Sequence, residues 1–142
     1  MDKNKHIGKE IRNLSNKIRR DLDEKHLDDL TVTQRWILGY LHRNSGRDVF
    51  QRDIEKEFDI RRSTVTGILQ ILERDGYIER QSVVSDGRLK KLVLTQKAID
   101  HHSRCAMQID ALEEKLCRGF SEEELQQFFD FCQRFSANLE QQ

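Results

Sequence analysis

Apolar side chains recur at every third or fourth position along much of the chain, which is the spacing of one face of an α-helix. In residues 7–22 the steps are four, three, four and four, and Lys and Arg crowd the opposite face. The helical period also fits residues 31–44, residues 50–75 with a short break at 59–61, and the chain from 96 onwards. The pattern therefore predicts a chain built mainly of helices.

Two of these helices carry start signals in the sequence. Thr31-x-x-Gln34 and Ser121-x-x-Glu124 are capping boxes, in which the side chains at both ends of the motif each accept a hydrogen bond from a backbone N–H of the other. Gly76 follows the last helical position before the period changes, and glycine adopts the left-handed conformation that often closes a helix. We therefore expect helices to begin just after 31 and 121 and another to end just before 76.

A change to period two marks a small β element. Side chains alternate over 77–84 and 89–95, and the residues between these runs include Asp86-Gly87. An Asp-Gly pair in that position favours a type I′ turn, whose two central residues both have positive φ. We expect a two-stranded hairpin that turns at Asp86-Gly87, with Leu92 and Leu94 facing the core.

The apolar stripes of the terminal helices are too long to be covered by the middle of the chain alone. Uncovered stripes with spacings of three and four are typical of a helical dimer interface. We therefore divide the chain into an N-terminal dimerisation helix at 1–30, a lobe at 31–95 and C-terminal dimerisation helices at 96–142. The expected interface residues are Ile7, Ile11, Leu14, Ile109, Leu112, Leu116, Leu125, Phe128, Cys132, Phe135 and Leu139.

The composition agrees with this picture. Of 142 residues, 36% are hydrophobic and 35% charged, which is lean for one compact core. Lys plus Arg and Asp plus Glu both number 25, so a strongly basic nucleic-acid coat protein is excluded, although local patches are not. No apolar run approaches the roughly 20 residues of a membrane helix, and the charged first thirty positions lack a signal-peptide core. Three widely spaced cysteines predict no disulfide framework and favour the cytoplasm.

Helix, short helix, turn, helix and basic hairpin, in that order, is the plan of a winged helix-turn-helix domain. A helix led by small polar and cationic residues suits the DNA major groove, where base edges present distinguishable donors and acceptors. Residues 80–91 carry four cations against one anion, a local charge of +3, and an Arg at the tip suits the minor groove. In the helix, Val65 is expected to face the core, and Gly67 leaves room for DNA. The predicted contacts with double-stranded DNA are Gln51, Arg52, Arg61, Arg62, Ser63, Thr64, Thr66, Gly67, Gln70, Arg88 and Lys90.

Motif detail adds a family resemblance. Val65–Arg80 resembles the helix-into-strand segment of MarR family regulators, Asp86–Thr95 resembles that family's wing, and Thr31–Gln34 resembles the start of its second helix. The resemblance implies a homodimeric winged-helix transcription regulator, usually a repressor, on a pseudo-palindromic operator, with an effector acting near a hinge. The chain departs from the family pattern at Arg61, where a Ser-like N-cap is common, at Ala98, where Gly is common, and in having no Pro before the wing.

Aromatic residues of the lobe have two interpretations. Rings with a polar group suit a small aromatic or phenolic effector, bound between the dimer layer and the DNA-binding lobe. Alternatively, the same rings simply form the core of the lobe. The candidate ligand-binding residues are Arg20, His26, Trp36, Tyr40 and Phe50.

Metal and redox chemistry receive less support. His101 and Cys105 lie four apart on one helical face, but two ligands are too few for a four-coordinate site. We expect His102, which lies on the same apolar stripe as Ile99, to pack in the dimer interface. A cysteine among apolar residues is usually inert, and nothing in the sequence lowers a thiol pKa. We therefore expect no metal and no cofactor, and a metal- or redox-responsive regulator of the same fold stays an alternative.

No enzyme class finds support in the sequence. The seven glycines are isolated, so no phosphate-cradling loop exists, and no nucleophile elbow is present. The chain is therefore predicted not to be an enzyme. The competing class is a winged-helix module that binds protein. Arg88 and the polar face beside it favour DNA, because a protein-binding face more often exposes apolar residues.

Overall fold

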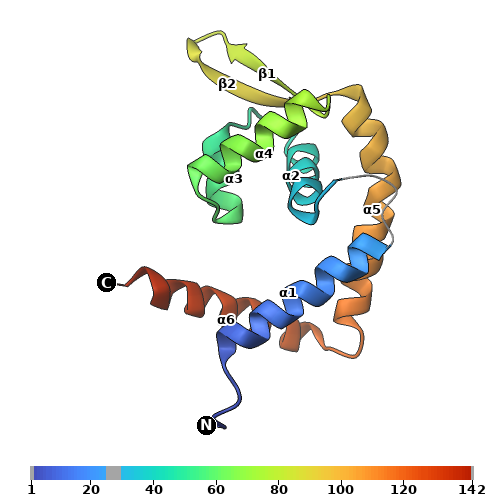
Figure 1. The fold of residues 1–142 in the computed structure, drawn as a ribbon, viewed down its shortest axis with the longest axis vertical. Coiled ribbons are helices and arrows are strands. Elements are labelled where there is room, and N and C mark those ends of the chain that lie inside the picture. Colours follow the sequence, from blue (N-terminus) through green and yellow to red (C-terminus); the bar gives the residue numbers. More distant parts are fainter. Residues whose placement is uncertain (1, 25–29, 142) are drawn as a thin grey trace. The chain divides into compact units, whose positions relative to one another are not determined.

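The computed structural model describes residues 2–24 and 30–141 (Figure 1). It confirms a mainly helical chain with one antiparallel hairpin. The chain divides into two compact units, residues 1–109 and 110–142. The elements are α1 (Ile7–Glu24), α2 (Val32–Arg43), α3 (Gln51–Phe58), α4 (Arg62–Arg74), β1 (Ile78–Val83), β2 (Asp86–Leu94), α5 (Gln96–Cys117) and α6 (Glu122–Glu140).

The expected helix boundaries are confirmed. Thr31 Oγ1 accepts from the Gln34 backbone N–H at 3.2 Å, and Gln34 Oε1 accepts from the Thr31 N–H at 2.9 Å. Ser121 and Glu124 make the same reciprocal pair at the start of α6. Gly76, just after α4, has a φ of 81°, in the left-handed region that glycine adopts without steric cost.

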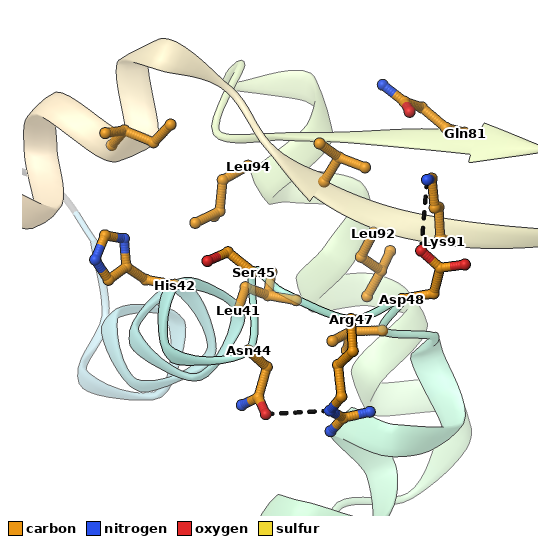
Figure 2. A pocket seen from close by; sticks show the side chains of 13 residues that line it. Leu41, His42, Asn44, Ser45, Arg47, Asp48, Gln81, Lys91, Leu92 and Leu94 are labelled. Atoms are coloured by element: carbon orange, nitrogen blue, oxygen red, sulfur yellow. Dashed lines mark hydrogen bonds and ion pairs between the residues drawn. The ribbon is translucent and has the colours of Figure 1, made fainter.

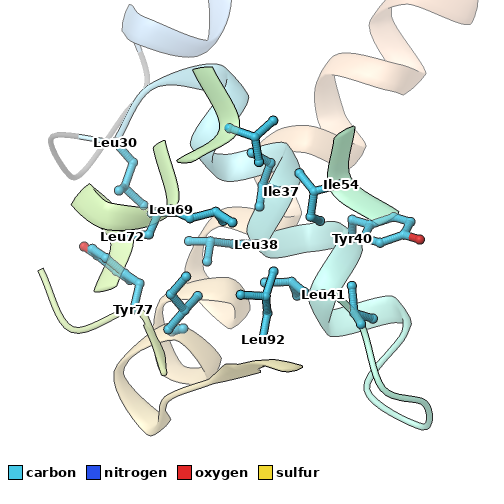
Figure 3. Packing of buried hydrophobic residues seen from close by; sticks show 14 residues of the cluster. Leu30, Ile37, Leu38, Tyr40, Leu41, Ile54, Leu69, Leu72, Tyr77 and Leu92 are labelled. Carbon is cyan, nitrogen blue, oxygen red and sulfur yellow. The ribbon is translucent and has the colours of Figure 1, made fainter. Parts of the chain in front are cut away.

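The core of the first unit joins α2, α3, α4 and the hairpin. Ile37 of α2, Ile54 of α3 and Leu69 of α4 are fully buried, and Figure 3 shows their side chains turned towards a common centre. Leu92 closes this core from β2, as expected. The Leu92 backbone N–H also donates to the carbonyl of Val49 at 2.7 Å, so the strand is tied to the segment that leads into α3. The core therefore fixes α3, α4 and the hairpin relative to one another.

The hairpin turns two residues earlier than the Asp-Gly signal predicts. Val83 pairs with Asp86, so Val84 and Ser85 form the turn, and Gly87 does not take a positive φ. The register shifts between Ser82, which pairs with Lys90, and Val83, which pairs with Asp86. Residues 87–89 therefore form a bulge in β2. Asp86 Oδ1 accepts from the Arg88 backbone N–H at 2.9 Å, and this local bond replaces the turn that we expected.

The buried face of α5 is also one position away from the predicted stripe. Ala98, His101 and Cys105 are buried, whereas Ile99 is exposed and His102 only half-buried. The packing of Ile99 and His102 in an interface between chains stays a prediction, because burial within one chain does not test it. Since Ala98 and His101 both have small or flat side chains, this face allows close packing that a count of apolar residues does not detect.

The terminal helices expose most of their apolar stripes. Ile7, Ile11 and Leu14 of α1 are exposed, and every side chain of α6 is exposed or half-buried. Leu112 differs from the other expected interface residues because it is already buried within the chain. Of the helices described, none is long and apolar enough to cross a membrane.

Candidate nucleic-acid interface

The N-terminal half of α4 presents a polar, exposed surface. Val65 is fully buried and anchors the helix to the core, as predicted, while Ser63, Thr64 and Gln70 are exposed. The N-cap, Arg61, has extended backbone and its side chain makes no capping hydrogen bond. Backbone N–H groups at a helix start carry partial positive charge, so this end of α4 favours a phosphate oxygen.

One line of residues along α4 points away from the core. Ser63, Gly67 and Gln70 follow one another at steps of four and three, so they share a helical face. An added Cβ at Gly67 would meet no atom within 4 Å. The centre of this face is therefore flat and open, with a polar side chain on either side.

A hydrogen-bonded group joins α3 to α4. Gln51 Nε2 lies 2.8 Å from Thr66 Oγ1 and 3.4 Å from the Arg62 carbonyl oxygen. Thr66 Oγ1 in turn donates to that carbonyl at 2.9 Å. Two of the predicted DNA contacts, Gln51 and Thr66, are thus bonded to each other.

A basic cleft of about 390 Å³ lies between α3, α4 and the hairpin. We call it the basic cleft. Five of its nine lining residues are cations and one, Glu55, is an anion, so a polyanion is attracted to it. The lining residues are Phe50, Gln51, Arg52, Glu55, Arg62, Arg80, Arg88, Leu89 and Lys90.

The cations of the basic cleft are held to different degrees. The Arg80 Nε lies 3.6 Å from Glu73 Oε2, and the Arg52 guanidinium lies 5.1 Å from the centre of the Phe50 ring. The Arg88 side chain is exposed at the wing. Asp86 accepts a hydrogen bond from the backbone N–H of Arg88, while the Arg88 side chain extends into solvent.

The structure does not assemble the expected aromatic effector pocket. Tyr40 belongs to the core, where its hydroxyl accepts from Arg47 Nη2 at 2.6 Å, and Phe50 lines the basic cleft. Trp36 is 38% exposed. Of the remaining candidates, Arg20 is exposed on α1 and His26 lies outside the described residues. The alternative interpretation, a core role, therefore holds for Tyr40.

A second cavity, of about 370 Å³, lies at the base of the hairpin (Figure 2) and was not expected from the sequence. Leu41, Val49 and Leu92 form its buried apolar part. At its rim, Lys91 Nζ lies 3.4 Å from Asp48 Oδ1. Its lining comes from four separate segments, 41–49, Gln81, 91–94 and Ile99, so no local sequence signal could have identified it.

His42, His101, His102 and Cys105 contact other side chains. Cys105 Sγ lies 3.5 Å from His101 Nε2, which confirms that the two share a face, and His101 meets Tyr77 edge-on. The ring of His102 stacks on that of His42, with centroids 3.9 Å apart. Across residues 2–24 and 30–141, no group of three or more His, Cys, Asp or Glu side chains is placed to hold a metal ion.

A helix-turn-helix followed by a basic hairpin defines the winged-helix class, and comparison with known proteins identifies the family. A sequence model of the MarR family matches residues 28–89. The chain is similar to the transcription regulator MarR of Oenococcus oeni PSU-1, at 30% identity and a TM-score of 0.80, covering 93% of this chain and 99% of that one. It is also similar to MepR of Staphylococcus aureus in complex with DNA, at 27% identity and a TM-score of 0.86, with 94% and 96% covered.

PcaV of Streptomyces coelicolor, in complex with its natural ligand, shares the fold at 23% identity, with a TM-score of 0.82 and 96% of each chain covered. The chain belongs to the MarR family of winged-helix transcription regulators. The motifs at 65–80 and 86–95 were therefore a correct indication of the family.

Proposed function

We propose that the chain regulates transcription by binding a pseudo-palindromic operator as a homodimer. The observation that carries this proposal is the basic cleft, which adjoins the exposed polar start of α4. Cations that neutralise phosphates supply affinity, and polar side chains that reach base edges supply specificity. The similar MepR has been crystallised with DNA, which supports the same use of the surface here.

Nine of the eleven predicted contacts have a proposed role at the DNA, whereas Gln51 and Thr66 are bonded to each other. Base edges would be read by the start of α4, whose polar groups fit the major groove. Arg88 would enter the minor groove from the wing. The phosphates would be held by Arg52, Arg61, Arg62 and Lys90, while Ser63, Thr64, Gly67 and Gln70 would face the bases.

A salt titration tests the proposal. The full-length protein is titrated onto the duplex upstream of its own gene and onto a scrambled duplex of equal length, at several salt concentrations. We expect tighter binding to the first duplex and a log–log slope of about −0.9 for each phosphate neutralised. Equal, weak binding to a set of tiled genomic duplexes, or no binding at low salt, contradicts the proposal and favours the protein-interaction alternative.

The wing is tested by Arg88→Ala. We expect duplex affinity to fall about tenfold and the magnitude of the salt slope to fall by about one, because a cation that displaces condensed counterions at the minor groove is lost. Arg104→Ala, at an exposed position of α5 outside the basic cleft, is the matched control and leaves both values unchanged. Unchanged DNA affinity in Arg88→Ala would refute the role of the wing.

The dimer is proposed from the exposed apolar stripes of α1 and α6, which need a second surface. In this proposal residues 1–30 and 96–142 serve assembly and residues 31–95 bind DNA. We further propose that the chain is a repressor that acts in the cytoplasm and requires no metal or cofactor. Sedimentation at micromolar concentration tests the assembly: a species of twice the chain mass is expected, and a monomer that still discriminates duplexes contradicts it.

Release by a small aromatic effector completes the proposal. Its support is the cavity at the base of the hairpin, because β2 forms one wall and continues to the wing, and the ligand complex of the similarly folded PcaV. A panel of phenols and benzoates is added to the protein–DNA complex, and at least one is expected to dissociate it. Ser45→Trp, which fills the rim of the cavity, should bind DNA normally and resist that compound. If the compound dissociates both the unmodified protein and Ser45→Trp from DNA equally, the effector binds outside this cavity.

A further inference from the structure

Thr66 lies on the recognition helix, yet its hydroxyl is engaged inside the protein. The hydroxyl has one hydrogen to donate, and the 2.9 Å bond to the Arg62 carbonyl uses it. It accepts a second bond, of 2.8 Å, from Gln51 Nε2. A base edge that needs a donor therefore finds none at Thr66 unless an existing bond is broken.

The amide of Gln51 has only one orientation that satisfies all three distances. With Nε2 directed at Thr66, it donates to the hydroxyl oxygen and also approaches the Arg62 carbonyl. With the amide flipped, its oxygen would face the carbonyl oxygen of Arg62 and would compete for the single hydroxyl hydrogen. The contact is therefore directional, from α3 to α4.

Helical geometry separates Thr66 from the outward face. Arg62, Thr66 and Glu73 lie on one side of α4 at steps of four and seven, and Glu73 pairs with Arg80 of β1. This side is therefore directed at α3 and the hairpin. The line through Ser63 and Gly67 is rotated away from it.

We propose that Gln51 and Thr66 form a positioning pair, which sets how α4 sits against α3, and that neither residue reads bases. The inference rests on the proposed function and deepens it, because it leaves base recognition to the exposed side chains of Ser63, Thr64 and Gln70. Gln51 is the first residue of α3 and lines the basic cleft with Arg62. The pair thus links the phosphate-holding cations to the base-reading face.

The pair is tested with Thr66→Val, which removes the hydroxyl at nearly constant volume, and with Thr66→Ser, which keeps it. Binding is measured on the preferred duplex and on the set of its single base-pair substitutions. We expect Thr66→Val to weaken the preferred duplex about three- to tenfold, the effect of losing one hydrogen bond, with the order of base preferences unchanged at every position. Thr66→Ser restores binding to within about twofold of the unmodified protein.

Gln51→Ala and the double variant complete the test. Both residues act through one contact. The DNA affinity of the double variant should therefore be no lower than that of the single variant with the lower affinity. A changed base preference at one position in Thr66→Val shows direct readout and overturns the proposal. Additive losses in the double variant, or full affinity in Thr66→Val, overturn it as well.

A second measurement keeps the inference separate from the proposed function. The unmodified protein, Thr66→Val, Gln51→Ala and the double variant are unfolded in urea without DNA. Coupling between Gln51 and Thr66 is expected as non-additive losses of stability. If the unmodified protein does not discriminate between duplexes, the proposed function fails. The unfolding data still show whether Gln51 and Thr66 are coupled. Additive unfolding data would overturn the positioning pair whatever the DNA results.

Discussion

α4 and α6 have the same kind of amphipathic pattern, but the apolar face of α4 is buried and that of α6 is exposed. In α4, Val65, Leu69 and Leu72 are 0% exposed, because α2, α3 and the hairpin surround them. In α6, which has a similar spacing of apolar residues, Phe128 is 51% exposed and Leu139 88% exposed. The period of a helix therefore predicts which residues share a face, but not whether that face is covered.

The difference also reverses which residues carry function. In α4 the apolar positions hold the helix to the core and the polar positions form the candidate DNA surface. In α6 the exposed aromatic stripe is itself the candidate interaction surface, since soluble proteins seldom leave such patches uncovered. Four substitutions, in order of decreasing effect, test this contrast.

Leu69→Ala should give the largest loss of stability. Removing a fully buried leucine leaves a cavity that costs about 2–5 kcal/mol in the free energy of unfolding. Urea unfolding measures it, and the loss should not depend on protein concentration. Ile71→Ala, at an exposed position of the same helix, is the control and should cost less than about 1 kcal/mol. Equal losses for the two variants would contradict the burial pattern of α4.

Phe128→Ala should act on assembly. A fully buried Phe contributes about 1.5–3 kcal/mol, and since the side chain is already half-covered, two copies should weaken the proposed dimer by about 2 kcal/mol. The dimer dissociation constant then rises about 30-fold in sedimentation equilibrium. The control is Val84→Ala, because Val84 is fully exposed at the hairpin turn. A stability loss that is independent of concentration would show that α6 packs within its own chain.

Gly67→Ala should have effects of opposite sign on folding and binding. Alanine favours a helix over glycine by about 1 kcal/mol, and its methyl group meets no atom within 4 Å. Unfolding should therefore require more urea, while DNA binding weakens because the methyl group stands on the outward face. Gly8→Ala in α1, which also has open space, is the control and should leave DNA binding unchanged. Unchanged binding in Gly67→Ala would remove this position from the interface.

Asp75→Asn should give the smallest effect. The hydrogen bond from Arg74, at 3.0 Å, holds the pKa of Asp75 below its usual value. A carboxyl whose pKa is lower in the folded state stabilises the fold above its unfolded pKa of about 4, and this contribution is lost as the pH falls through the folded value. Both side chains are exposed, so the contribution is small. Between pH 7 and pH 3 the melting temperature of the variant should fall slightly less than that of the unmodified protein. A larger fall in the variant would contradict a stabilising interaction between Arg74 and Asp75.

The sequence predicted the elements well where the signals are local. The capping boxes at Thr31 and Ser121, the glycine at 76 and the winged-helix order are all confirmed. The hairpin turn was misplaced because the side chain of Asp86 bonds the backbone of Arg88, a competition that the Asp-Gly rule does not include. The buried face of α5 was shifted because counting large apolar residues overlooked Ala98 and His101.

The candidate site divides in the same way. Its residue types and their order along the chain were predictable, because a polar helix start and a basic hairpin tip are contiguous in sequence. The use of each side chain was not. Thr66 and Ser63 both carry a hydroxyl, so the sequence does not distinguish them. In the structure Thr66 is half-buried beside Gln51, whereas Ser63 is exposed. The aromatic candidates divide likewise, since Tyr40 lies in the core and Phe50 lines the basic cleft.

By itself the sequence determined the helices and their caps, because hydrogen bonds and side-chain contacts between residues within about four positions fix these features. It also indicated the hairpin, through the change to period two, and the family, through the motifs at 65–80 and 86–95. Only the tertiary structure decided which hydroxyl is engaged within the protein, which four segments line the cavity at the hairpin base and which apolar stripe lies uncovered. Each of these depends on contacts between residues far apart in the chain, and the period of a single helix contains no information about what packs against it.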